Sequence, residues 1–453
     1  MIPQTNVPSA VVANATDAYI STFDIHMPSK RNKLFKRFGK QGVGFFNTLE
    51  TLGFVDAVNQ TNWSHYEEDY WHETFTVQTS VADPGAGNPV NIRLAASNVN
   101  SSGYFYVRLY DDVLFPNQVT GKVVAIDTTS FATPQITVQP HVAASDIGAL
   151  AAGQELSIYS NGFQEDTDQP DGRIAGVSEF SFGAKIIKET FTVSGTEMTN
   201  KAWFDTDSDG NYIGAYYLDG QLQADYRIAL QIDGASLWDS PITNTVLSNA
   251  GHRNMTGLIP WMTTNSPTAV YTGGLFSMSN VDYMIKRFTK LFATDTYMWM
   301  NGIDLSIEVE NVLTDFFDPN PKIFAGSVEG STSQELNIGF SGIKKSDFTF
   351  YLKNMGVFSN PKTYNIAGYN VTGLGLVTPL GTAKDPKKAV NIPFMGMRYK
   401  EMDGYSRKME VWPLSGAGKG PKNISRDRHT INMRCEMGTE FFGSNNFFLW
   451  QKA

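Results

Sequence analysis

One segment of this chain repeats a large apolar residue at every fourth position, and the segments on either side of it do not. The repeat lies within 212–238 and places its members on a single helical stripe: Leu218, Leu222, Tyr226 and Leu230. An uninterrupted helix over this segment would be about 40 Å long at 1.5 Å per residue. The segment also contains glycines that weaken a helix interior, namely Gly214, Gly220 and Gly234. The sequence therefore predicts one long helix in a chain that is otherwise rich in strand patterns.

The residues before this helix show strand patterns. Residues 73–82 alternate in polarity, and Ala184–Val193 is typical of a second long strand. Between them, turns rich in Gly, Pro and Asn at 84–165 separate short runs, which predicts a small all-β module. We expect this module to lie at the tip of a two-stranded arm. The strand-like runs within it are Tyr104–Leu109, Gly121–Ile126, Gln135–Val138 and Glu155–Tyr159.

The N-terminal segment divides into two parts. Residues 1–28 are polar and interrupted by prolines, which is typical of an extended arm. A helical stretch follows from Lys30 to about Leu52, with glycines within it. Its first part, Lys30–Lys40, is a concentrated basic stretch with aromatic residues between the cations. We interpret this stretch as a subunit contact first and a DNA contact second, although the pattern also fits a membrane surface.

Helix and strand patterns alternate after residue 241. Gly257–Met262 is predicted to be a strand, and so is Thr296–Met300. Asp304 is expected to cap a further helix. Between the two strands, Ser279 or Asn280 is expected to cap a helix with a continuous apolar face. The residues of that face are Val281, Met284, Ile285, Phe288, Leu291 and Phe292.

Residues 341–453 carry mostly strand signals, and the chain has no internal repeat. Together with the helices, these signals predict an α+β fold. The predicted strands are Phe348–Leu352, Val371–Val377, Arg398–Lys400, Lys408–Trp412, Thr430–Cys435 and Phe447–Trp450.

The composition limits the classes of function. Charged residues make up 18% of the chain, below the roughly 25% of typical soluble domains. Broad surfaces with few charges are favoured, because less free energy is lost when such a surface is removed from water. The net charge of −9 argues against a general nucleic-acid binder but is compatible with a container for DNA. The single Cys435 excludes an intramolecular disulfide. Because Met1–Asn14 lacks signal-peptide features and no apolar run approaches ~20 residues, a soluble intracellular protein is predicted.

One polar loop has part of the pattern of a calcium site. Asp205, Asp207 and Asp209 occupy the first, third and fifth positions, and Gly210 the sixth. The twelfth position, where a bidentate Glu is needed, holds Tyr216. We therefore interpret the loop as a polar turn whose carboxylates favour the start of the following helix.

Other residue types that form metal, catalytic or phosphate-binding sites in proteins occur in this sequence without the rest of the pattern that such a site needs. His65 and His72 lie among carboxylates, but their spacing fits neither one helical face nor a short metal-binding hairpin. Cys435 lies in a strand-like run with no histidine in a local motif, so a thiol nucleophile is not expected. Gly416–Gly420 lacks the spacing of a phosphate loop and is interpreted as a turn. The sequence predicts no catalytic, metal or cofactor site and no enzyme activity.

The order of these elements resembles the Hong Kong 97 type capsid fold of tailed phages. Ser160–Gly172 is similar to the segment that rejoins the hairpin arm after an inserted β-domain in some phage capsid proteins. Thr192–Asn200 is similar to the entry to the spine helix. Arg434–Asn445 is similar to the closing strands of the crAss-like and related groups. The resemblance covers most of the chain from about residue 30 onward.

This resemblance implies a subunit that tiles with copies of itself. It implies hexamers and pentamers in an icosahedral shell around double-stranded DNA, with portal and auxiliary head proteins as partners and assembly in the host bacterial cytoplasm. No local motif identifies the residues of a covalent crosslink, so none is carried over. The implied parts are an N-terminal arm and first helix at 1–60, a long β-hairpin arm (E-loop) at 61–83 and 166–195, an inserted β-module at 84–165, a P-domain with the spine helix at 196–256 and 341–453, and an axial A-domain at 257–340.

Two other functions stay open at this point. A carbohydrate-binding or hydrolytic phage tail component predicts a cleft with paired carboxylates and sugar binding by the 84–165 module. An encapsulin-like compartment predicts the same fold around cargo in place of DNA.

Overall fold

The computed structural model forms two compact units. Residues 64–180 form one unit, and the residues before and after them form the other. Strands β2 (Asn62–Glu68) and β9 (Val177–Gly183) pair with each other and belong partly to each unit. The structure describes residues 44–68, 74–99, 105–130, 132–170, 172, 177–199, 216–317, 342–359, 370–384, 391–418 and 420–453.

The unit at 64–180 contains a six-stranded antiparallel sheet that closes on itself. Its strand order is β3-β8-β5-β6-β7-β4. The two end strands are joined because the N–H of Gln78 donates to the carbonyl of Arg93 at 2.8 Å and the N–H of Ala95 donates to that of Thr76 at 2.9 Å. The sheet is therefore a small barrel filled by apolar side chains. Its strands are β3 (Thr74–Thr76), β4 (Val90–Arg93), β5 (Asp111–Leu114), β6 (Thr120–Asp127), β7 (Gln135–Pro140) and β8 (Glu155–Asn161).

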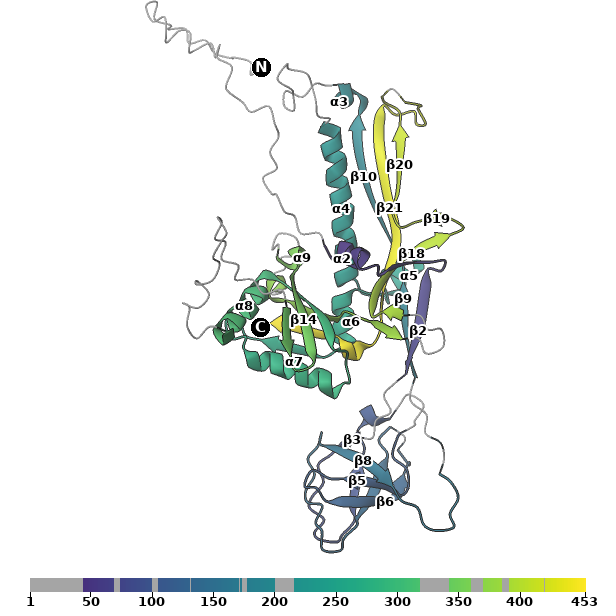
Figure 1. Ribbon diagram of the computed structural model, residues 1–453. Coiled ribbons are helices and arrows are strands. Elements are labelled where there is room, and N and C mark those ends of the chain that lie inside the picture. Colours follow the sequence, from purple (N-terminus) through teal and green to yellow (C-terminus); the bar gives the residue numbers. More distant parts are fainter. Residues whose placement is uncertain are drawn as a thin grey trace, which may run out of the picture. The chain divides into compact units, whose positions relative to one another are not determined.

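The other unit contains a sheet with a long helix on one face. Strand β21 (Arg428–Phe441) is central and pairs with β10 (Lys185–Ser194) along one side. On its other side it pairs first with β20 (Glu410–Ser415) and then with β18 (Met395–Met402). Helix α4 (Tyr216–Trp238) lies along β10 and β21 (Figure 1). Strands β1 (Val55–Val58) and β19 (Tyr405–Ser406) complete the sheet next to β18.

A second six-stranded sheet in the same unit is mixed. Its order is β11-β22-β15-β12-β14-β13, with β12–β14 and β11–β22 parallel and the other pairs antiparallel. Apolar side chains of α7 and α8 form one buried core with this sheet. The elements are β11 (Thr268–Tyr271), α7 (Met278–Lys290), β12 (Thr296–Asn301), α8 (Ile303–Phe317), β13 (Gly342–Lys345), β14 (Phe348–Asn354), β15 (Gly375–Pro379) and β22 (Phe448–Lys452).

Short elements connect these sheets. No helix in the described ranges is long and apolar enough to cross a membrane. The connecting elements are α2 (Phe45–Thr51), η1 (Ala96–Asn98), α3 (Gly195–Thr199), α5 (Thr245–Asn249), α6 (Leu258–Asn265), α9 (Gly356–Ser359), η2 (Val371–Gly373), β16 (Thr382–Lys384), β17 (Asn391–Pro393) and η3 (Ser444–Asn446).

The α+β prediction is confirmed, together with most predicted strands. The long helix is also present, as α4, and its buried side includes smaller apolar residues than the large ones of the predicted stripe. Tyr226 and Leu230 are only partly buried, whereas the fully buried apolar side chains include Ala224, Ile228 and Ile232. The stripe predicted from the sequence contains only large residues, whereas small residues such as Ala224 allow the helix to approach the sheet closely. The described helix is about 35 Å long at 1.5 Å per residue.

The prediction of a strand at Gly257–Met262 is wrong. This segment forms α6, with Gly257 as its N-cap residue. Pro260 is tolerated because the N–H groups of the first helical turn have no partner within the helix. A short apolar run cannot be assigned to helix or strand from its periodicity alone, which explains the error.

Two further predicted strands are wrong in extent, one in the predicted arm and one in the module. The arm strand predicted at 73–82 is present only as β3, followed by single bridges at Val77 and Val81, and it pairs with β8 inside the barrel and not with the strand at Ala184–Val193. In the described part of Tyr104–Leu109, Phe105 makes a single bridge, and the strand forms further on as β5. The adjacent aspartates of β5 conceal its strand pattern in the sequence.

The ends of the predicted helices shift by one or two residues. Ser277 caps α7, and Asn280 completes the capping box from the third helical position. Helix α8 begins at Ile303, so Asp304 lies in its first turn. The four buried apolar residues of α7 confirm its predicted face, but Phe292 lies beyond the helix end and is 68% exposed. The sheet around β12 also extends past residue 340, because β13, β14, β15 and β22 belong to it.

Candidate functional site

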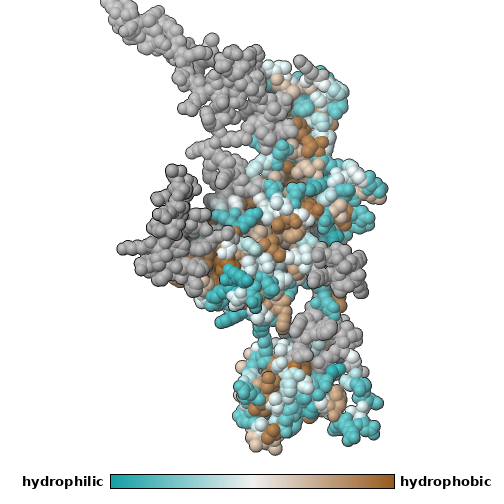
Figure 2. Space-filling view, viewed as in Figure 1, coloured by the Kyte–Doolittle hydropathy of each residue, from teal (hydrophilic) through white to brown (hydrophobic). Residues whose placement is uncertain are grey.

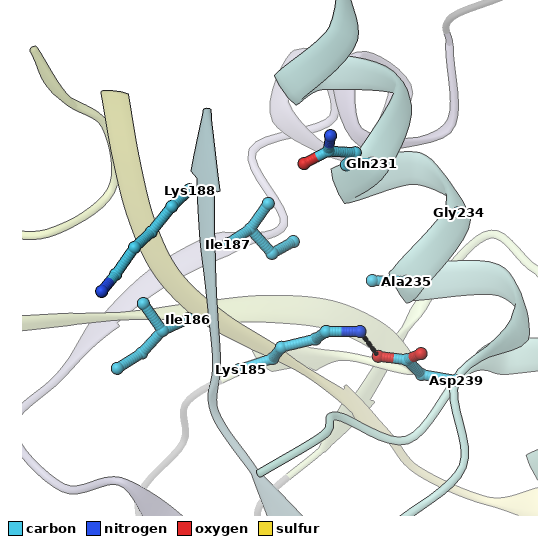
Figure 3. A pocket seen from close by; sticks show the side chains of 8 residues that line it. All are labelled: Lys185, Ile186, Ile187, Lys188, Gln231, Gly234, Ala235 and Asp239. Atoms are coloured by element: carbon cyan, nitrogen blue, oxygen red, sulfur yellow. Dashed lines mark hydrogen bonds and ion pairs between the residues drawn. The ribbon is translucent and has the colours of Figure 1, made fainter. Parts of the chain in front are cut away.

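The sheet of β10, β21 and β20 has one face covered by α4 and a second, outer face. Side chains alternate along each strand, so Ile187 points toward α4, whereas Ile186 and Lys188 point away from it (Figure 3). The strand register places Lys188 opposite Arg434, and Arg434 opposite Glu410. We define the outer face by the side chains that share this orientation: Ile186, Lys188, Thr190, Thr192, Glu410, Trp412, Thr430, Asn432, Arg434 and Glu436.

An ion-pair network holds part of the outer face in place. The Arg407 guanidinium contacts the Glu436 carboxylate at 2.5 Å, and the Arg434 Nε donates to Glu410 at 2.6 Å. Arg407 also approaches Glu410 at 3.8 Å, so one arginine joins the two carboxylates. The hydrogen bond from Arg434 lowers the pKa of Glu410. Because the Glu436 side chain is only 1% exposed, its charge depends on Arg407 for compensation.

Aromatic and apolar side chains lie beside this network. The Arg434 guanidinium lies 5.1 Å from the centre of the Trp412 ring and contacts the Tyr405 hydroxyl at 3.3 Å. Trp412 is 37% exposed, Tyr405 56% and Ile186 38%. Exposed apolar residues are interspersed with polar ones over the visible surface, without one large apolar area (Figure 2). The outer face is therefore a mixed aromatic and cationic surface.

A shallow groove of about 380 Å³ lies between β10 and α4 (Figure 3). Lys185 closes one end by pairing with Asp239 at 2.6 Å, and burial raises the pKa of Asp239 against the opposing effect of Lys185. Apart from this pair, small and apolar side chains such as Ile187 and Ala235 line much of the groove. We find no convergence of polar groups in it beyond this pair that would define a chemical site.

A buried carboxylate ties the first described residues to α4. Asp233 is completely buried and accepts hydrogen bonds from the N–H groups of Gly44 at 2.7 Å and Phe46 at 2.8 Å. Burial raises its pKa, and the backbone hydrogen bonds partly oppose that shift. Next to this contact, a groove of about 460 Å³ includes Thr48 and Lys353, whose side chains are 2.7 Å apart. The start of α2 is thereby fixed against two elements that are distant in sequence.

The barrel carries a polar cluster of its own. The Asp112 carboxylate contacts Lys122 at 2.6 Å and His141 Nε2 at 3.0 Å, and His141 Nδ1 lies 2.9 Å from the Thr120 hydroxyl. The Lys122 ammonium also donates to the carbonyl of Gly162 at 3.0 Å. The Asp112 carboxylate of β5 is thus shared by Lys122 of β6 and by His141, which directly follows β7, so the cluster ties these parts of the barrel together.

Comparisons with known proteins give matches among solved structures. A structure of Gordonia phage Cozz is 11% identical, with 99% of this chain and 98% of that chain covered and a TM-score of 0.41. A structure of Mycobacterium phage Ogopogo is 8% identical, with 96% and 98% covered and a TM-score of 0.45. The capsid structure of cyanophage P-SCSP1u is 8% identical, with 99% of each chain covered and a TM-score of 0.41. All three are phage structures. No protein-family model and no curated protein matches the chain.

The structure separates the residues that the sequence had suggested as candidates. His65 lies in β2, where its Nε2 contacts Glu67 at 3.1 Å and its ring stacks on Phe180, while His72 lies outside the described residues. Cys435 is buried in β21, and burial raises the pKa of its thiol to about 12. A thiolate nucleophile at this position is therefore disfavoured at neutral pH.

Of three other sequence features, the structure describes one in part and two not at all. The described part of Gly416–Gly420 belongs to the turn between β20 and β21, where Gly418 has a φ of 88°. The polar loop at Asp205–Gly210 and the basic stretch Lys30–Lys40 lie outside the described residues. Within the ranges that the structure describes, no group of three or more His, Cys, Asp or Glu side chains is placed to hold a metal ion.

Sequence reasoning missed the outer face and the Asp233 contact. Glu410 and Glu436 come from different strands, β20 and β21, and Arg407 lies in the connection between β19 and β20, so no local motif contains all three. Asp233 lies within a helix pattern, where an aspartate is normally taken to be exposed. Only its position among buried neighbours distinguishes it.

Proposed function

We propose that the chain is the major capsid protein of a tailed phage, with the Hong Kong 97 type fold. The observation that carries the proposal is the arrangement of the elements. A long helix lies along a long, mainly antiparallel sheet, the strands of a separate mixed sheet follow that helix in sequence, and two paired strands lead to an inserted β-barrel. This is the element order that the resemblance in the sequence implies.

The parts of the fold are assigned accordingly. Helix α4 is the spine helix, and it forms the P-domain with β10, β18, β20 and β21. The mixed sheet around β12 is the A-domain, which surrounds the axis of each capsomer. Strands β2 and β9 belong to the E-loop, and the barrel is the inserted module that it carries.

The chemistry of such a protein is association with copies of itself. The subunits form hexamers and pentamers of an icosahedral shell that encloses double-stranded DNA, and the shell also contacts portal and auxiliary head proteins. The shell is assembled in the host bacterial cytoplasm and becomes the virion capsid. Contacts spread over several elements allow modest pairwise affinities to give a stable shell through multivalency.

The proposal is tested by electron microscopy and light scattering on the protein expressed alone. Closed shells, tubes or hexameric rings are the expected result. A monodisperse monomer at every concentration, which stays monomeric when the phage's other head proteins are added, would contradict it.

The contents of the same particles distinguish a capsid from the encapsulin-like alternative. Shells from the phage-infected host that contain a protein cargo and no DNA would favour a compartment over a capsid. For the tail-component alternative, the discriminating result is saturable sugar binding by a protein that forms no particles.

A further inference from the structure

The short helix α2 is fastened at its start by a carboxylate from a distant element. Gly44 precedes the helix and has no side chain with which to cap it. Asp233 of α4 takes this role, because its carboxylate accepts hydrogen bonds from the N–H groups of Gly44 and Phe46. No cation pairs with Asp233 in the part of the chain that the structure describes, so these N–H groups are the main compensation of its charge.

Further along, α2 contacts both sheets of its unit. The Lys353 ammonium of β14 donates to the Thr48 hydroxyl at 2.7 Å, and this hydroxyl donates to the carbonyl of Gly44 at 2.5 Å. Near the end of the helix, Glu50 pairs at 2.5 Å with Lys408, which lies in the connection between β19 and β20. Helix α2 therefore joins α4 and its sheet to the mixed sheet around β12, and its first turn is held from both sides.

The contact between α2 and the mixed sheet is loose. The groove of about 460 Å³ lies between them, with Thr48 and Leu52 on the side of α2 and Met298 and Met355 on the side of the sheet. Leu52 is 39% exposed, whereas Met298 and Met355 are 6% and 1% exposed. A small outward movement of α2 would therefore uncover two buried methionines.

The groups around Asp233 do not neutralise its charge. Tyr226 lies on the same helix, and burial, followed by the charge of Asp233, raises the pKa of its phenol, so it stays neutral at neutral pH. Lys353 bonds to the Thr48 hydroxyl, and Glu50 is paired with a lysine at the far end of α2. Burial raises the pKa of Asp233, and the hydrogen bonds from backbone N–H groups oppose this shift in part. The ionised carboxylate is thus costly to keep in this buried position.

We propose that α2 is a clasp between the two sheets, and that ionisation of Asp233 favours the opening of this clasp. In the open state Asp233 is in contact with water, and the groove over Met298 and Met355 is uncovered. Phe45 and Leu49 are buried in the closed state, so the open state is a minor population. The inference concerns a single chain and does not depend on the proposed shell role.

The direction of the pH dependence follows from the two states. In the open state Asp233 has its ordinary pKa of 3.8, whereas burial raises its pKa in the closed state. The closed state therefore binds the proton more tightly, and the open fraction rises as the pH rises from the ordinary value through the closed-state pKa. Above the closed-state pKa, the open fraction is constant.

Hydrogen exchange followed by mass spectrometry measures the opening. The full-length protein is labelled between about pH 4 and pH 8, and the rates in α2 are corrected for the intrinsic pH dependence of exchange. We expect the opening of α2 to increase with pH in the unmodified protein and to lose that dependence in Asp233→Asn. Glu50→Gln, which removes an exposed carboxylate from α2 itself, should keep the dependence. Opening that is independent of pH in the unmodified protein, or still dependent on pH in Asp233→Asn, would overturn the proposal.

Oxidation of methionine tests whether the mixed sheet is uncovered at the same time. Hydrogen peroxide is expected to oxidise Met298 and Met355 faster at higher pH, measured relative to Met402, and this increase should be absent in Asp233→Asn. Met402, which is 63% exposed, and Met284, which is buried in the core of the mixed sheet, are the fast and slow references. Opening of α2 without faster oxidation of Met298 and Met355 would contradict a clasp between the sheets.

A second variant keeps the test decisive if Asp233→Asn does not fold. Thr48→Val removes the hydroxyl that joins Lys353 to Gly44 and keeps a side chain of similar size. It should increase the opening of α2 at every pH and keep its pH dependence, because Asp233 is still present. Unchanged exchange in Thr48→Val would show that this hydroxyl does not hold α2 to the mixed sheet, and the clasp would be ruled out.

Discussion

At the scale of single residues, buried charges distinguish this protein from a chain stabilised only by apolar packing. Glu436 is 1% exposed at its side chain and Asp233 is completely buried, yet they are compensated in different ways. Glu436 faces the guanidinium of Arg407, whereas Asp233 faces backbone N–H groups.

Removing Arg407 should cost more than removing the whole pair. We expect Arg407→Met to lower the free energy of unfolding by about 3 kcal/mol, because it leaves the Glu436 charge buried and unpaired. The double variant Arg407→Met/Glu436→Met should recover much of that loss, as measured by urea denaturation. Lys400→Met, which removes a lysine that has no ion-pair partner among the described residues, serves as the control. Additive losses in the double variant would rule out this account.

The raised pKa of Asp233 gives its contribution to stability a definite sign with pH. Its folded-state pKa lies above the ordinary value of 3.8, so the folded protein binds this proton more tightly than the unfolded chain does. Stability should therefore fall as the pH rises through the folded-state pKa. Relative to Asp233→Asn, the wild-type protein should become more stable as the pH is lowered from 7 toward 4, as measured by denaturant unfolding at each pH. A difference that is constant or opposite in sign would show that burial does not dominate at this position.

At the scale of elements, close packing depends on small residues whose importance is hidden in the sequence. The existence of the long helix was predictable from its periodicity, but its buried face was not, because Ala224 carries no strong signal. The barrel was predictable as an all-β module, but its closure was not, because β5 begins with the two aspartates Asp111 and Asp112. The outer face could not be predicted at all. Its members Lys188 and Arg434 become neighbours only through the register of β10 and β21.

Gly121 should be intolerant of even one methyl group. A Cβ atom built at this position would lie 2.8 Å from a Val138 methyl carbon and 2.9 Å from the Gln139 carbonyl, both on the neighbouring strand β7. We expect Gly121→Ala to destabilise the barrel by about 1–3 kcal/mol through overpacking. Thermal unfolding followed by circular dichroism measures the loss, and Gly172→Ala, whose Cβ meets no atom within 4 Å, is the control. Equal melting of the two variants would contradict the expected crowding.

At the scale of the whole molecule, the proposed shell depends on surfaces that one chain leaves incomplete. The outer face is a candidate for such a surface, and the sequence predicts another in the N-terminal residues. The basic stretch Lys30–Lys40 was interpreted from the sequence as a subunit contact, and it lies outside the described residues. Its role remains a prediction.

Neutralising this stretch should impair assembly. We expect the variant Lys33→Gln/Lys36→Gln/Arg37→Gln to give fewer particles than the unmodified protein, because cations that bind an acidic neighbour are lost. Sedimentation and electron microscopy measure the particle yield. Particles in normal yield that contain less DNA would indicate that the stretch contacts DNA and not a neighbouring subunit. Particles in normal yield with the normal amount of DNA would contradict both interpretations.

The pairing of β3 with β8 has a consequence for how this protein can change over generations. Because Thr74 lies opposite Ser157, the barrel begins and ends on adjacent strands, whose backbones are about 4.8 Å apart. A short turn is long enough to span that gap. The whole barrel can therefore be gained, lost or exchanged as a cassette at one point of the gene, while the chain on either side of the joint keeps its register.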